Sequence, residues 1–300
     1  MTKVGKDVTA TVERIRALPI WRLPADPQPL GGGITNLNFM VSQGSEAFVV
    51  RVGDDIPVHQ VMRFNERAAS EAAFRAGLSP EVVHAEPGIL VIRFISGRTL
   101  RAEDVREPRN LEAIVGLIKR VHTEMPRRLR GPALAFWVFH VLRDYGHTLE
   151  EGGSPYRPRL GELLGAAAEL ERDVGAIELV YGHNDLLPGN FIDDGRRLWV
   201  IDWDYAGFNS PLFDLANLAG NNGLGPDAEA FMLEAYFGRP ASADLWRRYG
   251  AMKCASLLRE AMWSMVSEIH SKLDFDYASY TADYLGRFER ALAEHTAGHR

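Results

Sequence analysis

Three oxygen-bearing side chains, Asp185, Asn190 and Asp202, lie close together in the sequence. A turn pair, Asp194-Gly195, separates two apolar runs between Asn190 and Asp202 and predicts a hairpin. Such a hairpin would bring Asn190 and Asp202 to one end of a sheet, within reach of one hard cation. Because Mg²⁺ prefers oxygen ligands and keeps several waters, two protein ligands are enough. With Asp185 to accept or orient a hydroxyl proton, the set has what phosphoryl transfer needs.

A glycine cluster near the N-terminus fits the same chemistry. The segment Gly31–Asn36 (GGGITN) lies between β-like runs and can bring backbone N–H groups close to phosphate oxygens. Arg51 then interrupts an apolar strand, where a cation would face the phosphates. Glu66 is the candidate partner of this arginine, and Glu71 on the same expected helix is the competing one. Taken singly, each feature is also typical of an ordinary turn, a strand end or a solvated helix face.

The sequence around Arg51 predicts a first lobe built on an antiparallel sheet. Apolar runs bounded by turn residues predict strands, and alanines at helical spacing before Gly77 predict a helix that ends there. The expected elements are a helix over Val8–Leu18, strands over Leu37–Ser42 and Ala47–Val52, a helix over Val61–Gly77, and strands over Val82-Val83 and Ile89–Ile95.

The composition changes after Ser96-Gly97, where a mostly helical second lobe is expected. Helical spacing predicts helices over Leu111–Val121, Leu134–Tyr145, Leu160–Val174 and Ala241–Ser271. One β-like island, Val180–Ala206, interrupts them and carries the three oxygen-bearing side chains. We therefore predict an α+β chain of two unequal lobes, residues 1–96 and 97–300, joined by a hinge near Phe94–Gly97.

Composition excludes several classes of protein. The chain has 300 residues, 46% of them hydrophobic, and a formal net charge of −6, which gives no sign of a nucleic-acid footprint. The lone Cys254 excludes an intramolecular disulfide and a multi-cysteine metal site. The longest apolar run, Ala133–Phe139, is far short of the roughly 20 residues that span a bilayer. We expect a cytoplasmic protein without membrane insertion, and the oligomeric state is left open.

The catalytic-loop motif resembles that of the protein-kinase-like fold. His183-Asn184-Asp185 followed by Asn190 is similar to H-R-D-x-x-x-x-N, and Asp202-Trp203-Asp204 stands where protein kinases carry D-F-G. The residues of both motifs resemble those of the aminoglycoside phosphotransferase and choline/ethanolamine kinase families. That resemblance implies a bilobal fold with a small antiparallel-sheet lobe. It also implies ATP and Mg²⁺, with Asp185 as the catalytic base, Asn190 and Asp202 as metal ligands, and His183 as a brace of the loop.

The same resemblance implies a set of residues that contact the nucleotide. These are Thr35 and Asn36 in the glycine cluster, Arg51 with Glu66, and the hinge residues Phe94 and Ile95 beside the adenine. The fold usually carries a lysine at position 51, so Arg51 is a departure that choline kinases share. A guanidinium stays charged and can bind phosphate through two nitrogens.

The C-terminal segment resembles the part of choline kinases that encloses a quaternary ammonium. Trp263 and Tyr280 match aromatic positions of that cage, and Tyr205 is a further candidate. Aromatic faces suit this group because a trimethylammonium cannot donate a strong hydrogen bond. Glu260 replaces one cage tryptophan and could supply negative charge one turn before Trp263. An acidic position of choline kinases is Asn221 here.

These departures leave the acceptor open. A small cationic amino alcohol is expected, choline being the first candidate, with ethanolamine or another cationic alcohol as alternatives. An aminoglycoside phosphotransferase would instead need a wider pocket lined mainly by carboxylates, with little use for Trp263. A third possibility is a pseudokinase-like protein that binds a ligand without turnover. In all three cases Asp214 is expected to brace the catalytic loop rather than to bind a ligand.

Overall fold

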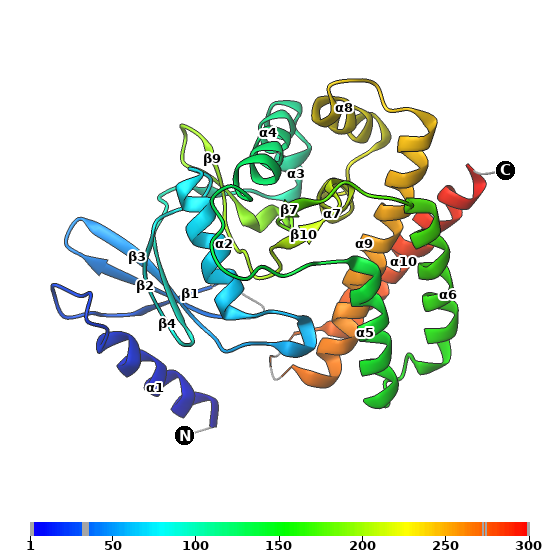
Figure 1. Ribbon diagram of the computed structural model, residues 1–300. Helices are drawn as coiled ribbons and strands as arrows, with labels where there is room; N and C mark the ends of the chain where they lie inside the picture. Colours follow the sequence, from blue (N-terminus) through cyan, green and yellow to red (C-terminus); the bar gives the residue numbers. More distant parts are fainter. Residues whose placement is uncertain (1–2, 32–35, 272, 274, 299–300) are drawn as a thin grey trace.

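The first lobe is a five-stranded antiparallel sheet with the strand order β1-β2-β3-β5-β4 (Figure 1). The structure is a computed structural model that describes residues 3–31, 36–271, 273 and 275–298. The strands are β1 (Gln28–Leu30), β2 (Leu37–Gln43), β3 (Glu46–Val52), β4 (Val82–Glu86) and β5 (Ile89–Arg93). The predicted hairpin of β2 and β3 is confirmed. The last predicted strand was too long, because β5 ends at Arg93 and the chain turns into the hinge.

One face of this sheet is covered by α1 (Lys3–Arg16). Alternate residues of β2 and β3, Phe39 with Val41 and Phe48 with Val50, are buried in a small core together with Ile15 of α1. The period of two is what places these side chains on one face. The helix predicted over Val8–Leu18 therefore exists, although it starts earlier and ends at Arg16.

The second helix, α2 (Arg63–Arg75), belongs to the larger core. Its alanines Ala69, Ala72 and Ala73 are fully buried, and their small side chains let the helix pack closely. They also give α2 a fixed orientation, in which Glu66 on the same face is buried as well. Asn65 of this helix donates to the carbonyl of Ala206 at 2.7 Å, so α2 reaches the segment that follows β9.

The second lobe is mostly helical and is arranged around α9 (Ala243–His270), which packs against α5, α6, α7 and α10. Its other helices are α3 (Ala102–Arg106), α4 (Pro108–Glu124), α5 (Val138–Glu151), α6 (Arg157–Val174), α7 (Pro211–Asn222), α8 (Pro226–Phe237) and α10 (Tyr277–Ala297). The helix predicted over Leu134–Tyr145 begins only at Val138. Within the described ranges, none of the helices combines the length and the apolar composition that crossing a membrane requires.

Two small sheets position the catalytic loop. One has the strand order β6-β8-β9 and the other pairs β7 with β10. The strands are β6 (Arg98–Thr99), β7 (Val180–Gly182), β8 (Phe191–Asp193), β9 (Leu198–Val200) and β10 (Gly207–Asn209). The predicted hairpin is that of β8 and β9, with Gly195 at φ 81° in its turn. The predicted lobe boundary at 96/97 falls between β5 and β6.

Candidate active site

The loop after β7 is held by one buried carboxylate, Asp214 of α7. Its two oxygens accept hydrogen bonds from the backbone N–H of His183 at 2.9 Å and of Asn184 at 2.7 Å. His122 Nε2 lies 2.9 Å from the same carboxylate. These bonds, led by the one to His122, hold the pKa of Asp214 below its usual range although burial opposes them. Asp214 is therefore placed as the brace that its sequence position suggests.

His183 joins this loop to the residue after β9. Its Nδ1 accepts a hydrogen bond from the backbone N–H of Asp185 at 3.3 Å. The other nitrogen, Nε2, lies 2.9 Å from the carbonyl of Ile201, to which it must donate. Both ring nitrogens are used by a neutral imidazole, and burial lowers the pKa of His183 accordingly. The ring is thus a brace in this structure.

Asn184 carries a strained backbone that the sequence motif did not reveal. Its φ is 64°, in the left-handed region that asparagine tolerates better than most residues. Its side-chain amide donates to the carbonyls of Tyr205 at 3.0 Å and Gly207 at 3.2 Å, and its oxygen accepts from Asn209. A single buried side chain therefore ties the catalytic loop to the segment that follows β9.

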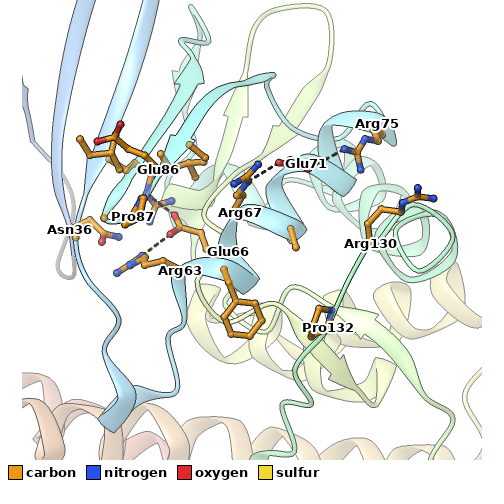
Figure 2. A pocket seen from close by; sticks show the side chains of 18 residues that line it. Asn36, Arg63, Glu66, Arg67, Glu71, Arg75, Glu86, Pro87, Arg130 and Pro132 are labelled. Carbon is orange, nitrogen blue, oxygen red and sulfur yellow. Dashed lines mark hydrogen bonds and ion pairs between the residues drawn. The ribbon is translucent and has the colours of Figure 1, made fainter. Parts of the chain in front are cut away.

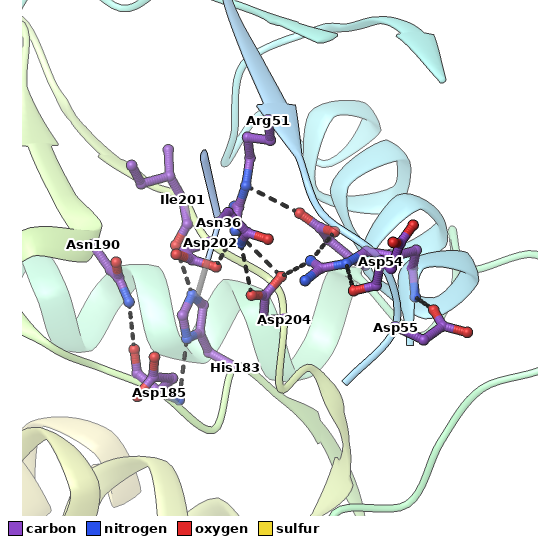
Figure 3. A network of polar contacts seen from close by, with 12 residues as sticks. Asn36, Arg51, Asp54, Asp55, His183, Asp185, Asn190, Ile201, Asp202 and Asp204 are labelled. Atoms are coloured by element: carbon purple, nitrogen blue, oxygen red, sulfur yellow. Dashed lines mark hydrogen bonds and ion pairs between the residues drawn. The ribbon is translucent and has the colours of Figure 1, made fainter. Parts of the chain in front are cut away.

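The structure brings Asp185, Asn190 and Asp202 together (Figure 3). Asn190 Nδ2 donates to the carbonyl of Asp185 at 2.8 Å, which leaves the amide oxygen available. The backbone N–H of Ile201 donates to the carbonyl of Asn190 at 3.0 Å and brings Asp202 alongside. Asp202 has a φ of 69°, a second left-handed residue at this site. Burial, then the charge of Glu260, raises the pKa of Asp185 well above its ordinary value.

An ion network joins the first lobe to the segment after β9 (Figure 3). Arg51 Nη2 lies 2.9 Å from Asp202 Oδ1 and 3.3 Å from Asp204 Oδ1, and Arg51 Nε lies 3.2 Å from Glu66 Oε1. Arg63 Nη1 lies 2.7 Å from Glu66 Oε2 and 2.9 Å from Asp204 Oδ1. Burial alone would lower the pKa of Arg51, but these carboxylates, Asp202 first, raise it. Two guanidinium groups thus share three carboxylates.

The choice between Glu66 and Glu71 is decided by these contacts. Glu66 is the residue that pairs with Arg51, whereas Glu71 pairs with the exposed side chains of Arg67 at 2.9 Å and Arg75 at 3.0 Å. Arg63 and Asp204 are functional candidates that sequence reasoning missed. A signal did exist for Asp204, because it follows the D-F-G-like aspartate by two positions.

The remaining nucleotide-binding candidates are placed in different ways. Thr35 lies outside the described residues. Asn36 Nδ2 donates to Asp204 Oδ2 at 3.1 Å, and with Arg51 and Glu66 it lines a cavity of about 610 Å³ beside α2 (Figure 2). Phe94 and Ile95 line a different cavity of about 340 Å³ at the hinge. The structure therefore gathers Asn36, Arg51 and Glu66 but does not place the hinge pair with them.

The four acceptor-site candidates meet between α9, α10 and the segment after β9. Trp263 Nε1 donates to the Tyr205 hydroxyl oxygen at 2.9 Å, and the Tyr280 hydroxyl donates to Glu260 Oε2 at 3.2 Å. The rings of Trp263 and Tyr280 are 5.8 Å apart, edge to face. Asn221 borders this group, because its side-chain oxygen accepts from the Tyr284 hydroxyl at 3.2 Å and the Tyr284 ring is stacked on that of Tyr280 at 4.5 Å.

Sequence reasoning missed Arg259, which links this group to Asp185. Its Nη1 lies 2.7 Å from Glu260 Oε1 and 4.0 Å from Asp185 Oδ1, and its guanidinium carbon lies 4.2 Å from the ring centre of Tyr205. The residue is only 1% exposed. The signal was an Arg-Glu pair in an otherwise apolar stretch of a long helix, where charged residues are rarely buried unless they are paired.

His59 is a second residue that sequence reasoning missed, and it packs against Trp263 of the acceptor-site group. Its Nδ1 lies 3.1 Å from the Tyr145 hydroxyl and its Nε2 lies 3.0 Å from Ser267 Oγ. Its ring centre is 5.5 Å from that of Trp263. Burial first, and then the charge of Arg259, lowers the pKa of His59 to about 3. The histidine is therefore neutral and structural at ordinary pH.

The donor set at Asn190 and Asp202 fits a hard divalent cation that is shared with a phosphate group. Both side chains offer oxygens, and the nearby carboxylates outnumber the guanidinium groups. In the part of the chain that the structure describes, no cluster of three or more His, Cys, Asp or Glu side chains could hold a metal ion by itself. Mg²⁺ keeps several waters and takes further ligands from substrate phosphates, so two protein oxygens are enough to hold it.

Comparison with known proteins agrees with this arrangement. The sequence pattern described as the phosphotransferase enzyme family matches residues 26–251. The protein LicA of Haemophilus influenzae is 30% identical over 259 residues, which cover 82% of this chain and 75% of LicA. A probable ethanolamine kinase of Arabidopsis thaliana is 28% identical over 290 residues, with 84% and 75% covered.

A solved structure shares the fold over nearly the whole chain. It is that of a choline/ethanolamine kinase family protein from Mesorhizobium loti, with a TM-score of 0.76, 25% identity, and 97% of this chain and 98% of that chain covered. The predicted fold class, a small antiparallel sheet followed by a mostly helical lobe, is confirmed. The predicted family resemblance is confirmed as well.

Proposed function

We propose, from the premise that this chain belongs to the phosphotransferase enzyme family, that it is an ATP-dependent kinase of small amino alcohols. Choline and ethanolamine are the first candidate acceptors. The observation that carries the proposal is the meeting of Asp185, Asn190 and Asp202 beside the aromatic group that contains Trp263 and Tyr280. The relatives that are named for ethanolamine kinase activity support the same acceptor class.

Asp185 is the residue that would act on the acceptor. Its carboxylate lies at the junction between the catalytic loop and Arg259, where it can orient a hydroxyl and take up its proton as the bond to phosphorus forms. His183 fixes the backbone of Asp185, and Asp214 fixes the backbone of His183. The loop is therefore held in place before any substrate arrives.

Asn190 and Asp202 would hold Mg²⁺, which when bound offsets charge on the phosphates. Arg51 lies against Asp202 and can turn a guanidinium edge toward the same phosphates. Asn36, immediately before β2, contacts Asp204 and brings the first lobe over this group. These residues would position the nucleotide while Asp185 handles the proton.

The aromatic and narrow character of the acceptor side favours an amino alcohol over an aminoglycoside. Trp263 is 6% exposed and Tyr205 is 7% exposed, so both rings are packed inside the lobe rather than spread along a wide cleft. The neighbouring glutamate, Glu260, is held by Arg259 and Tyr280. A polycationic sugar would need several free carboxylates instead.

The direct test is ATP consumption with choline, ethanolamine and kanamycin as separate acceptors. We expect turnover with an amino alcohol and none with kanamycin. Turnover with kanamycin alone would show that the acceptor class is wrong. ATP binding without turnover on any acceptor would favour a ligand-binding protein instead.

The role of Asp185 is tested with Asp185→Ala. General-base and orienting groups contribute about 10²- to 10⁴-fold, so we expect kcat to fall by about that factor while ATP binding, measured by calorimetry, is retained. Asp283→Ala, the same substitution at an exposed position of α10, is the matched control. Unchanged turnover in Asp185→Ala would contradict the mechanism.

A further inference from the structure

Arg259 lies inside the group of side chains that would surround the acceptor. It comes from the middle of α9, is 1% exposed, and its guanidinium lies over the ring of Tyr205 at 4.2 Å. Phe136 is the next aromatic ring, at 5.4 Å. A cation from the chain itself therefore occupies the aromatic face that would otherwise receive the positive end of a substrate.

Glu260 is already neutralised by this arrangement. One carboxylate oxygen is 2.7 Å from Arg259 Nη1, and the other accepts from the Tyr280 hydroxyl at 3.2 Å. The negative charge that an ammonium group would seek is thus shared with a guanidinium. A substrate that carries positive charge alone would meet an equal charge next to Asp185, and this repulsion disfavours it.

One edge of the Arg259 guanidinium lacks a hydrogen-bond acceptor. Its Nε and Nη2 atoms are buried and form no hydrogen bond with any residue that the structure describes. These two nitrogens are neighbours on the side-on edge of the planar group, the edge that binds a carboxylate through two parallel hydrogen bonds. Buried N–H groups without an acceptor are costly, so an oxyanion that enters here gains both bonds and relieves that cost.

We propose that Arg259 binds a carboxylate of the acceptor, so that the preferred substrate is an amino alcohol that also carries an acidic group. The hydroxyl would reach Asp185, which is 4.0 Å from the guanidinium, while the carboxylate pairs with the free edge. The ammonium would lie toward Glu260 and Trp263. Hydroxy amino acids and carboxylated quaternary alcohols have this distribution of charge.

The inference rests on the proposed function and narrows its acceptor class. The oxyanion at Arg259 is assigned to the acceptor rather than to the transferred phosphoryl group, because the contacts of Arg259 are with Tyr205 and Glu260. The residues proposed for the phosphates, Arg51 and Asp202, form a separate network. If Arg259 binds the acceptor carboxylate, its loss should change the preference between acceptors. If it binds the phosphoryl group, its loss should lower kcat equally for every acceptor.

The experiment compares acceptors that differ by a carboxylate. Ethanolamine is matched with L-serine and L-homoserine, and choline is matched with L-carnitine, in an ATP-consumption assay of the full chain. A charge-assisted bidentate contact corresponds to about 10- to 100-fold in affinity, so at least one acidic acceptor should exceed its matched amino alcohol in kcat/KM by about tenfold or more.

The role of the residue is tested with Arg259→Leu. This variant should lose the preference for the acidic acceptor, mainly through a higher KM for that acceptor. Its kcat/KM for ethanolamine or choline should increase. Because the substitution leaves Glu260 buried without its cation, the double variant R259L/E260Q removes both charges and is measured alongside. Arg157→Leu, which removes an exposed arginine that pairs with Glu150, is the control for the loss of charge.

The outcomes are distinguishable. A wild-type preference for ethanolamine or choline over all three acidic acceptors would overturn the inference and leave the proposed function intact. An equal fall of kcat on every acceptor in Arg259→Leu and in R259L/E260Q would assign the guanidinium to the phosphoryl group and would also overturn it. Absence of turnover on all five acceptors would overturn the proposed function and the inference with it.

Discussion

Two buried arginines lie at this site, Arg51 against Asp202 and Arg259 near Asp185, and their surroundings differ. Arg51 comes from the first lobe and meets Glu66 of α2 and, about 150 positions further along the chain, Asp202 and Asp204 after β9. Arg259 comes from the second lobe, and its closest carboxylate is that of the next residue, Glu260. The carboxylates of the first site come from distant segments, whereas the nearest carboxylate of the second lies on the same helix as its arginine.

The charge balance of the two sites differs in the same way. Arg51 and Arg63 together face three carboxylates, so the nucleotide side has an excess of negative charge that a metal cation would offset. The pair of Arg259 and Glu260 is balanced and leaves guanidinium N–H groups in excess instead. We infer that the network of Arg51 and Arg63 is stabilised by a bound cation and that the site of Arg259 and Glu260 is stabilised by a bound anion.

The strongest test of this comparison is Asp202→Asn. Asparagine tolerates the left-handed backbone at this position, so the fold should survive. We expect kcat to fall by about 10³-fold on every acceptor, because a metal ligand and its charge are lost together. Titration of Mg²⁺ in the kinetic assay should show a higher requirement. An unchanged Mg²⁺ dependence would contradict the assignment of Asp202.

The second prediction concerns His59, whose ring contacts that of the acceptor-site candidate Trp263. The pKa of His59 is lowered to about 3 by burial, whereas an unfolded histidine titrates near 6.5. The unfolded state therefore binds more protons below pH 6.5, and the folded protein loses stability as the pH falls from about 6.5 toward 3. The slope from this one group is at most about 1.4 kcal/mol per pH unit.

Urea unfolding of the wild type and of His59→Gln between pH 7 and pH 5 measures this slope. Glutamine can keep contacts to Tyr145 and Ser267 without taking up a proton, so its unfolding free energy should depend less on pH. Parallel curves for the two proteins would show that His59 is not the titrating group. The titratable groups around Arg51 are the same in both proteins, so they should affect the pH dependence of the two unfolding free energies equally.

The third prediction compares two glutamates on one helix. Glu66→Gln weakens the hold on Arg51 and Arg63, and we expect kcat/KM for ATP to fall by about tenfold with little change in KM for the acceptor. Glu71→Gln is the comparison: Glu71 lines the same cavity, but its partners are the exposed Arg67 and Arg75 rather than Arg51, so its effect should be smaller. Equal effects of the two substitutions would remove the distinction between the buried and the exposed ion pairs.

The smallest effect is expected at the start of α9. Ser242 caps this helix by accepting a hydrogen bond from the backbone N–H of Leu245 at 3.2 Å. Ser242→Ala should lower the free energy of unfolding by about 1 kcal/mol and leave the kinetic constants unchanged, because packing rather than the cap fixes the middle of the helix. A changed acceptor preference would mean that the acceptor side depends on the whole of α9.

The parts of the site that rest on local pattern could be predicted from the sequence. The turn at Asp194-Gly195 sufficed to place Asn190 and Asp202 together. The choice of Glu66 over Glu71 was also within reach, because Glu66 lies three residues before the buried Ala69 and therefore on the same helix face.

Other parts could not be predicted because they depend on contacts between distant segments. Arg259 is buried only because Tyr205 and Asp185 meet it from elsewhere in the chain. Arg63 and Asp204 pair across 141 positions. The spacing of residues along one helix or hairpin contains no information about such partners. The aromatic residues were predicted through family resemblance, which the sequence reasoning did not extend to Arg259.

The left-handed backbone of Asp202 has a consequence for how the chain tolerates substitution. Asparagine and glycine adopt this conformation with little strain, whereas valine, isoleucine and threonine are penalised by their branched Cβ atoms. A mutational library scored for cellular abundance would therefore keep asparagine and glycine at position 202 and deplete the branched residues. Scored for growth that depends on turnover, the same library would keep aspartate alone.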